Sequence, residues 1–203
     1  MTFLGFDGIP GRDRKYFNLT SMLRLRGLIP VTIFTILGST TNFTAIATNL
    51  AKDGDDIKQL WETKTCIACN LREAKLKGAK LKGANLRGSN LGLAELNGVE
   101  LTGGDLVNVI LTGANLADAD LVDANLRNAD LRDANLTNIF LTRADLRGAL
   151  LENANLTNAF LRGANLAGAN LRGANLEGAD WRSAILCDTI LPDGSVSDRD
   201  CQE

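Results

Sequence analysis

The sequence predicts a solenoid, in which the chain bends at regular intervals and stacks one coil on the next. From Leu71 to Leu191 every fifth residue, 25 positions in all, is leucine, with Trp181 as the single exception. Five residues turn an α-helix through about 500°, so these leucines would form no apolar stripe, and on a flat strand they would alternate between faces. A chain that corners once per pentad instead returns every leucine to one interior line.

The residues between the leucines support this prediction. Two positions before each leucine, from Ala74 to Ala184, 18 of 23 residues are alanine. The position directly before the leucine is mainly Asn or Asp, and the two positions after it are polar, charged or Gly. We expect the leucine and the small residue to point inward and the other three to face water. Asn, Asp and Gly tolerate bent and left-handed backbone, which suits a corner in every pentad.

Runs such as Ala114-Asn115-Leu116 and Ala134-Asn135-Leu136 resemble the A-[ND]-L-x-x unit of pentapeptide repeat proteins. The resemblance extends over residues 71–191. It implies an all-β solenoid, a right-handed quadrilateral β-helix with four pentads to a coil and about six coils.

The first 47 residues differ in composition from the repeat. Basic residues precede an apolar run at 28–37, and a small-residue motif follows at 45–47. This pattern predicts a secretory signal in residues 1–47, cleaved after Ala47, so that the mature chain has no membrane contact. An uncleaved membrane anchor and a buried helix are the alternatives. The long segment before Met22 leads to the further hypothesis that translation starts at that residue.

Residues 48–70 are expected to close the open start of the solenoid. The segment 55–64 begins with acidic residues and ends with a lysine, which matches the dipole of a short helix. Ile57, Leu60 and Trp61 fall at helical spacing and are expected to cover the first coil. The alternative role for the tryptophan is to hold a ligand.

The chain has four cysteines, an even number that is consistent with export to an oxidising compartment. Cys66 and Cys69 lie at the start of the repeat, and Cys187 and Cys201 flank its end. Three pairings are possible, but most of the solenoid separates the two ends, so we expect Cys66–Cys69 and Cys187–Cys201 disulfides. The second would fix the tail, residues 192–203, over the last coil. Buried thiols and redox or metal chemistry at the Cys-x-x-Cys pair are the alternatives.

The composition lowers the expectation of catalysis. The chain contains no histidine, the usual general base and the commonest metal ligand. Its glycines follow the repeat phase rather than a phosphate-binding motif. We therefore expect a protein that is not an enzyme and binds neither a cofactor nor a metal.

The charge of the repeat argues against nucleic-acid mimicry. Some pentapeptide repeat proteins protect DNA gyrase by imitating duplex DNA, which requires a strongly acidic face. Residues 70–191 hold 13 basic and 14 acidic residues, so the repeat is nearly neutral and no nucleic-acid partner is expected. The basic residues gather in the first coil and suggest an anion-binding end, with an ordinary solvated surface as the alternative. They are Arg72, Lys75, Lys77, Lys80, Lys82 and Arg87.

An aromatic pair is the candidate contact site for a protein partner. With four pentads to a coil, residues 20 apart stack, so Phe140 and Phe160 lie above one another in the outward position usually held by Asn or Asp. Their expected rim is Thr142, Arg143 and Arg162. Exposed aromatic residues with a charged rim are typical of contact sites. Packing against a bend in the solenoid is the alternative.

The outward asparagines of another face form a column that resembles an amide ladder, with hydrogen bonds along the axis. The column consists of Asn115, Asn135, Asn155 and Asn175.

Together these features predict a non-catalytic exported rod that acts as an interaction or scaffolding module for an unknown protein partner. Resemblance to exported family members, together with the signal segment, implies the periplasm or the thylakoid lumen. The alternatives are a DNA-mimicking topoisomerase regulator and a thiol redox protein that uses Cys66 and Cys69. The oligomeric state is left open.

Overall fold

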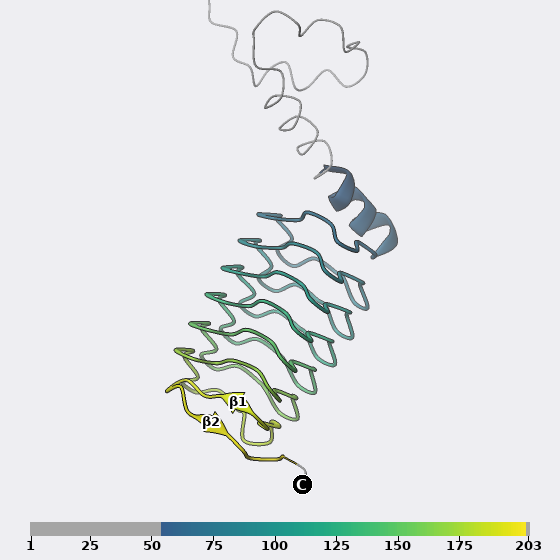
Figure 1. Cartoon of the computed structure of the whole chain (residues 1–203). Helices are drawn as coiled ribbons and strands as arrows, with labels where there is room; N and C mark the ends of the chain where they lie inside the picture. Colours follow the sequence, from purple (N-terminus) through teal and green to yellow (C-terminus); the bar gives the residue numbers. More distant parts are fainter. Residues whose placement is uncertain (1–53, 202–203) are drawn as a thin grey trace, which may run out of the picture. The chain divides into compact units, whose positions relative to one another are not determined.

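The computed structural model describes residues 54–201, which form a short helix followed by a stack of similar coils (Figure 1). The predicted signal segment 1–47, with its cleavage site and the alternative start at Met22, lies outside the described residues.

Each coil of the stack contains four pentads. Parallel β-bridges join every outward Asn or Asp position to the residue 20 positions later, from Thr65↔Asn85 to Asn170↔Ile190. Backbone hydrogen bonds run along the axis in the same register: Leu116 donates to Asn135 O at 2.8 Å, and Asn135 donates to Ala114 O at 2.9 Å. The backbone groups of one coil are therefore satisfied by its neighbours.

A turn makes the corner of each pentad. In the pentad of Leu116, the N–H of Ala119 donates to the leucine carbonyl at 3.1 Å, and Asp118 between them has a φ of 58°. The same position has a positive φ in almost every pentad and holds mainly Gly, Asn or Asp. These residues adopt left-handed backbone at the lowest steric cost, which explains their recurrence there.

The Asn or Asp before each leucine has a local role. The side-chain oxygen of Asn115 accepts a hydrogen bond from the N–H of Ala117 at 3.2 Å, and Asp120 accepts from Val122 at 3.1 Å. Such bonds recur along the stack and satisfy a backbone donor beside the corner. The predicted amide ladder is wrong for most of its length. Asn135 donates to Asn115 at 3.1 Å, but Asn155 donates to the hydroxyl of Thr137 instead.

The leucines and the small residues form one continuous core along the axis. All the repeat leucines from Leu71 to Leu171 are buried, and the intervening alanines are buried with them. Burying each leucine contributes roughly 1.5–3 kcal/mol, so a single aliphatic column is the main source of cohesion.

A helix of residues 54–63 lies against the first coil. Leu60 is buried in the core and Ile57 packs against it, whereas Trp61 is 52% exposed, so the expectation that this tryptophan covers the coil is wrong. The helix ends one residue before the predicted Lys64, which has a φ of 54°. A left-handed residue directly after the last helical one is a common helix ending.

The last coil ends in a small hairpin. Strand β1 (Thr189–Ile190) pairs antiparallel with β2 (Val196–Ser197), with Thr189 opposite Ser197 and Ile190 opposite Val196 (Figure 1).

Candidate interaction sites

The structure places Phe140 and Phe160 on neighbouring coils as direct bridge partners. Their rings are parallel within 3°, their centroids are 4.9 Å apart, and the residues are 41% and 42% exposed. Each phenylalanine replaces an Asn or Asp. Within residues 54–201, the N–H groups of Thr142 and Arg162 accordingly lack the side-chain hydrogen bond found in most other pentads.

The bridge partners beyond the two rings are acidic: Asp120 precedes Phe140 and Asp180 follows Phe160. Of the predicted rim, Arg143 is bound to Asp123 by two hydrogen bonds of 2.7 and 2.6 Å.

Arg162 approaches Asp180 only to 3.8 Å, and Arg182 approaches the same carboxylate at 3.4 Å. The Asp180 carboxylate thus interacts with both arginines. These three residues and Ser183 line a hollow on the surface.

Exposed aliphatic residues on another face do not extend this site. Ile110 and Leu150 both bridge to Asp130, so they belong to a different column of outward side chains. They provide matched control positions for the aromatic pair.

Acidic neighbours offset much of the predicted anion-binding end. Lys80 forms an ion pair with Glu100, Arg87 with Asp105 at 3.1 Å, and Arg72 with Glu73 at 3.3 Å. Among the described residues, Lys75, Lys77 and Lys82 form no ion pair, although Lys75 bridges to Glu95 in the next coil. The structure therefore distributes these cations over the faces of one coil and places acidic residues beside several of them.

Three acidic residues of the middle coils are paired with arginine, whereas Asp118, Asp120 and Asp133 form no ion pair among the described residues. A hydrogen bond from Arg132 holds the pKa of Asp130 below its usual range, and Arg147 does the same for Asp145. Arg143 lowers the pKa of Asp123 by the same means. These carboxylates are ionised at neutral pH, but each has a cation against it, which reduces the acidic character of the surface.

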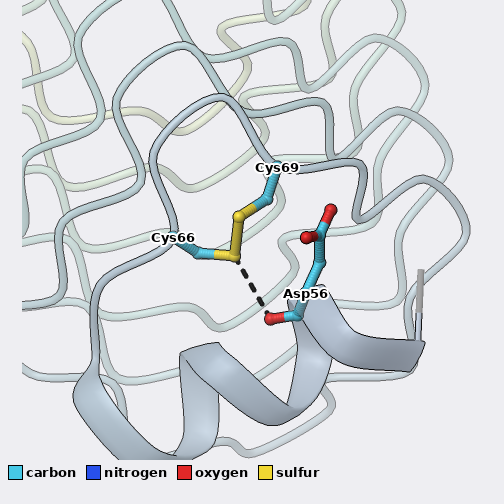
Figure 2. Close-up of side chains that lie close together, drawn as sticks. All are labelled: Asp56, Cys66 and Cys69. Atoms are coloured by element: carbon cyan, nitrogen blue, oxygen red, sulfur yellow. Dashed lines mark hydrogen bonds between the residues drawn. A yellow bond between two sulfur atoms is a disulfide. The ribbon is translucent and has the colours of Figure 1, made fainter. Parts of the chain in front are cut away.

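At the start of the stack, Cys66 and Cys69 are joined by a disulfide, here called the lid disulfide (Figure 2). Both residues are buried, because they occupy the leucine and small-residue positions of the first pentad. Asp56 of the helix is also buried, and its carboxylate accepts the N–H of Asn70 at 2.8 Å. The carbonyl oxygen of Asp56 lies 3.2 Å from the sulfur of Cys66.

The two sulfurs and the Asp56 carboxylate lie within 4.8 Å of one another, a grouping that sequence reasoning missed because the aspartate lies on the helix. Metals bind the thiolate, so this group can hold an ion only after the disulfide is reduced. In the oxidised form, the Cys66–Cys69 disulfide constrains the turn against which the helix packs.

At the other end, Cys187 and Cys201 form a second disulfide, here called the tail disulfide, which is more accessible to solvent than the lid disulfide. Asp188 lies beside it, so a second group of potential ligands exists there under the same condition. The tail disulfide links the last coil to the end of the described chain.

The helix in the described part of the chain, residues 54–63, is too short and too polar to cross a lipid bilayer.

Comparison with protein families identifies the repeat. A family model described as Pentapeptide repeats matches in 8 copies, which together cover more than half of the chain. The matched ranges are 69–113, 94–133, 110–148, 129–168, 144–181 and 164–193. Proteins of this family fold as right-handed quadrilateral β-helices, in agreement with the four pentads per coil. The predicted resemblance is confirmed. A search of curated proteins finds no significant match.

Solved structures of pentapeptide repeat proteins are similar to this chain. HetL from the cyanobacterium Nostoc sp. strain PCC 7120, involved in heterocyst differentiation regulation, is 40% identical with a TM-score of 0.64. The match covers 66% of this chain and 62% of HetL, so it spans less than two thirds of that protein. Rfr23 from the cyanobacterium Cyanothece 51142 is 30% identical with a TM-score of 0.46, over 67% of this chain and 94% of Rfr23. A pentapeptide repeat protein from the Arabidopsis thaliana thylakoid lumen is 28% identical with a TM-score of 0.24, over 53% and 71% of the two chains.

Proposed function

This chain belongs to the pentapeptide repeat family, and we propose that it is a non-catalytic, exported rod that binds a protein partner through its aromatic pair, Phe140 and Phe160. The regular pentads supply a rigid scaffold, because each coil is hydrogen-bonded to the next and filled by leucine. Function then depends on the outward positions where the sequence departs from the repeat.

The exposed aromatic pair is the observation on which this proposal rests. Asn or Asp at positions 140 and 160 would satisfy a backbone donor beside the corner, as Asn115 and Asp120 do. Phenylalanine gives up that hydrogen bond and leaves two stacked rings in water. Folding of the solenoid alone does not favour phenylalanine over Asn or Asp at these two stacked positions. Burial of the two rings under a partner protein does favour it.

The direct test is affinity capture from the compartment in which the chain resides. We expect Phe140→Asn/Phe160→Asn to keep the circular dichroism and melting temperature of the parent, because Asn suits both positions, and to lose the partner. The matched control, Ile110→Asn/Leu150→Asn, makes the same chemical change on another face and should keep the partner. Capture of the same partner by the phenylalanine variant, or its loss from both variants, would exclude this site.

Export is the second part of the proposal. It is supported by the pattern of residues 1–47 in the sequence and by two disulfides, which persist in oxidising compartments. The periplasm and the thylakoid lumen are the proposed locations. Mass spectrometry of the precursor and the mature protein should give a mature N-terminus directly after Ala47. A mature chain that retains residues 28–37 would contradict cleavage at this site.

The two alternative functions have less support. A topoisomerase regulator that imitates DNA needs a strongly acidic face, whereas residues 70–191 are nearly neutral and Asp123, Asp130 and Asp145 each have an arginine against them. A thiol redox protein needs an accessible thiolate, whereas Cys66 and Cys69 are buried under the helix. Localisation of a tagged chain separates the first alternative from the exported rod. A disulfide-reductase assay of the parent and Cys66→Ser tests the second.

A further inference from the structure

The last coil ends in a row of backbone groups, residues 174–183, here called the C-terminal edge. In a complete coil the N–H of each leucine and the N–H two residues later donate to the following coil. Leu156, for example, donates to Asn175 O at 2.8 Å. The carbonyl of the small residue accepts from the following coil, as Ala154 does from the N–H of Asn175 at 2.9 Å. The last coil has no following coil to supply these partners.

The tail replaces the missing coil over only part of the last one. The guanidinium of Arg199 donates to Ala184 O at 2.7 Å, and Asp200 accepts the N–H of Leu186 at 3.3 Å. Ser195 O accepts the N–H of Leu191 at 2.8 Å. The tail disulfide holds the chain in this position, so the coil beyond residue 183 is covered.

The C-terminal edge is uncovered. Within residues 54–201, four N–H groups and two carbonyls that a following coil would pair with have no hydrogen-bond partner. They are the N–H groups of Leu176, Gly178, Trp181 and Ser183 and the carbonyls of Ala174 and Ala179. The side chains of Leu176 and Trp181, which occupy leucine positions, are only partly buried, whereas Leu171 in the coil before is buried. An exposed edge of this kind is a template for pairing with an added strand.

The chemistry of the edge indicates an acidic occupant. Among the groups that would pair with a following coil, four donors stand against two acceptors, so the edge favours carbonyl and carboxylate oxygens. The hollow beside it is formed by Asp180, Ser183 and two arginines, Arg162 and Arg182, whose side chains are 72% and 90% exposed. Within the hollow, which Glu177 of the edge does not line, one carboxylate between two cations leaves one positive charge unmatched, and an acidic side chain of a partner would neutralise it.

We propose that the C-terminal edge binds an extended, acidic segment of a partner protein. The segment adds to the last coil by backbone hydrogen bonds, covers Leu176 and Trp181, and places a carboxylate between Arg162 and Arg182. The hollow adjoins the aromatic pair, because Asp180 is the bridge partner of Phe160 and Arg162 belongs to the expected rim. The proposal does not use the two rings, so Phe140→Asn/Phe160→Asn should bind the acidic segment as the parent does. Loss of binding in that variant would assign the acidic segment to the aromatic site instead.

The chain itself supplies two matched probes. A synthetic peptide that copies residues 114–125 contains three aspartates and no basic residue, and one that copies residues 74–85 contains four lysines and no acidic residue. Both have alanine and leucine at the same positions of two pentads, so they differ mainly in charge. Fluorescence anisotropy of labelled peptides against the full chain should show binding of the acidic peptide and at least about tenfold weaker binding of the basic one.

Variants of the chain locate the binding. Arg162→Gln/Arg182→Gln should lower the affinity for the acidic peptide by at least about fivefold, because this variant removes the unmatched positive charge. The matched control, Arg132→Gln/Arg147→Gln, removes two arginines that are each paired with an aspartate in the middle of the stack and should leave the affinity unchanged. Raising the salt concentration should weaken binding to the parent more than to the first variant.

Several results would overturn the proposal. No binding of the acidic peptide would exclude the proposed ligand. Equal binding of the two peptides would exclude the charge preference, and equal losses in both arginine variants would place the site elsewhere. A dimer in analytical ultracentrifugation that excludes the acidic peptide would show a second copy at the edge instead of an acidic partner segment.

Discussion

Truncation of one buried leucine tests how the stack is held together. Leu116 is fully buried in the middle of the leucine column. Leu116→Ala removes three carbon groups at about 0.8 kcal/mol each, a transfer loss of about 2.4 kcal/mol. The coils on either side are fixed by backbone hydrogen bonds and cannot collapse fully, so the remaining cavity raises the expected loss to about 3–4 kcal/mol.

Equilibrium urea unfolding, followed by far-ultraviolet circular dichroism, measures this loss. With a slope of about 2 kcal/mol per molar urea, the midpoint should fall by about 1.5–2 M. Leu150→Ala is the matched control, because this leucine occupies an outward position and is exposed. It should change the stability by no more than about 0.5 kcal/mol. Similar losses in the two variants would refute the assignment of the inward column as the source of cohesion.

Three further predictions concern charge, backbone and disulfides. Asp130 and Asp145 have pKa values lowered by Arg132 and Arg147, so the stability they contribute is complete above the unfolded-state value of about 3.9 and is lost as the pH falls below it. The urea midpoint should therefore drop between about pH 4 and pH 2, and less so in Arg132→Gln/Arg147→Gln; equal drops would contradict this origin. Gly173→Ala should lower the stability by about 1–2 kcal/mol in urea unfolding, because Gly173 has a φ of 70° and an added Cβ would lie 2.6 Å from a neighbouring side-chain oxygen; an unchanged midpoint would show that the corner accepts a side chain there. Mild reductant followed by thiol labelling and mass spectrometry should open the tail disulfide at least about tenfold faster than the lid disulfide, since the lid sulfurs are buried; the reverse order would show that the helix does not shield them.

The five-residue period was enough to predict which side chains point inward. One leucine per pentad leaves only an interior column as a common environment for Leu71 to Leu171, and the structure has that column. The number of pentads in a coil could not come from the period, because three or five pentads would also bring each leucine inside. The value of four came from the family resemblance, and the bridge register agrees with it.

Features that depend on how one segment rests on another were harder to predict. Helical spacing put Ile57, Leu60 and Trp61 near one face, but the rotation of the helix on the first coil left the tryptophan exposed. The asparagine column was compatible with either axial or local hydrogen bonds, and local bonds dominate because the N–H two residues on is always within reach. The open edge at residues 174–183 depends on the path of the tail, which no repeat pattern specifies.

Cysteine cross-linking tests the coil register, the central claim, most directly. Asn115 and Asn135 are bridge partners on neighbouring coils, about 4.8 Å apart as in any β-ladder. With the native disulfides intact, Asn115→Cys/Asn135→Cys should form a disulfide under mild oxidation, detected by mass spectrometry of the digested chain. Asn115→Cys/Asp130→Cys, with a spacing of 15 residues, places the thiols on different faces and should not. Cross-linking at 15 residues and not at 20 would contradict a coil of four pentads.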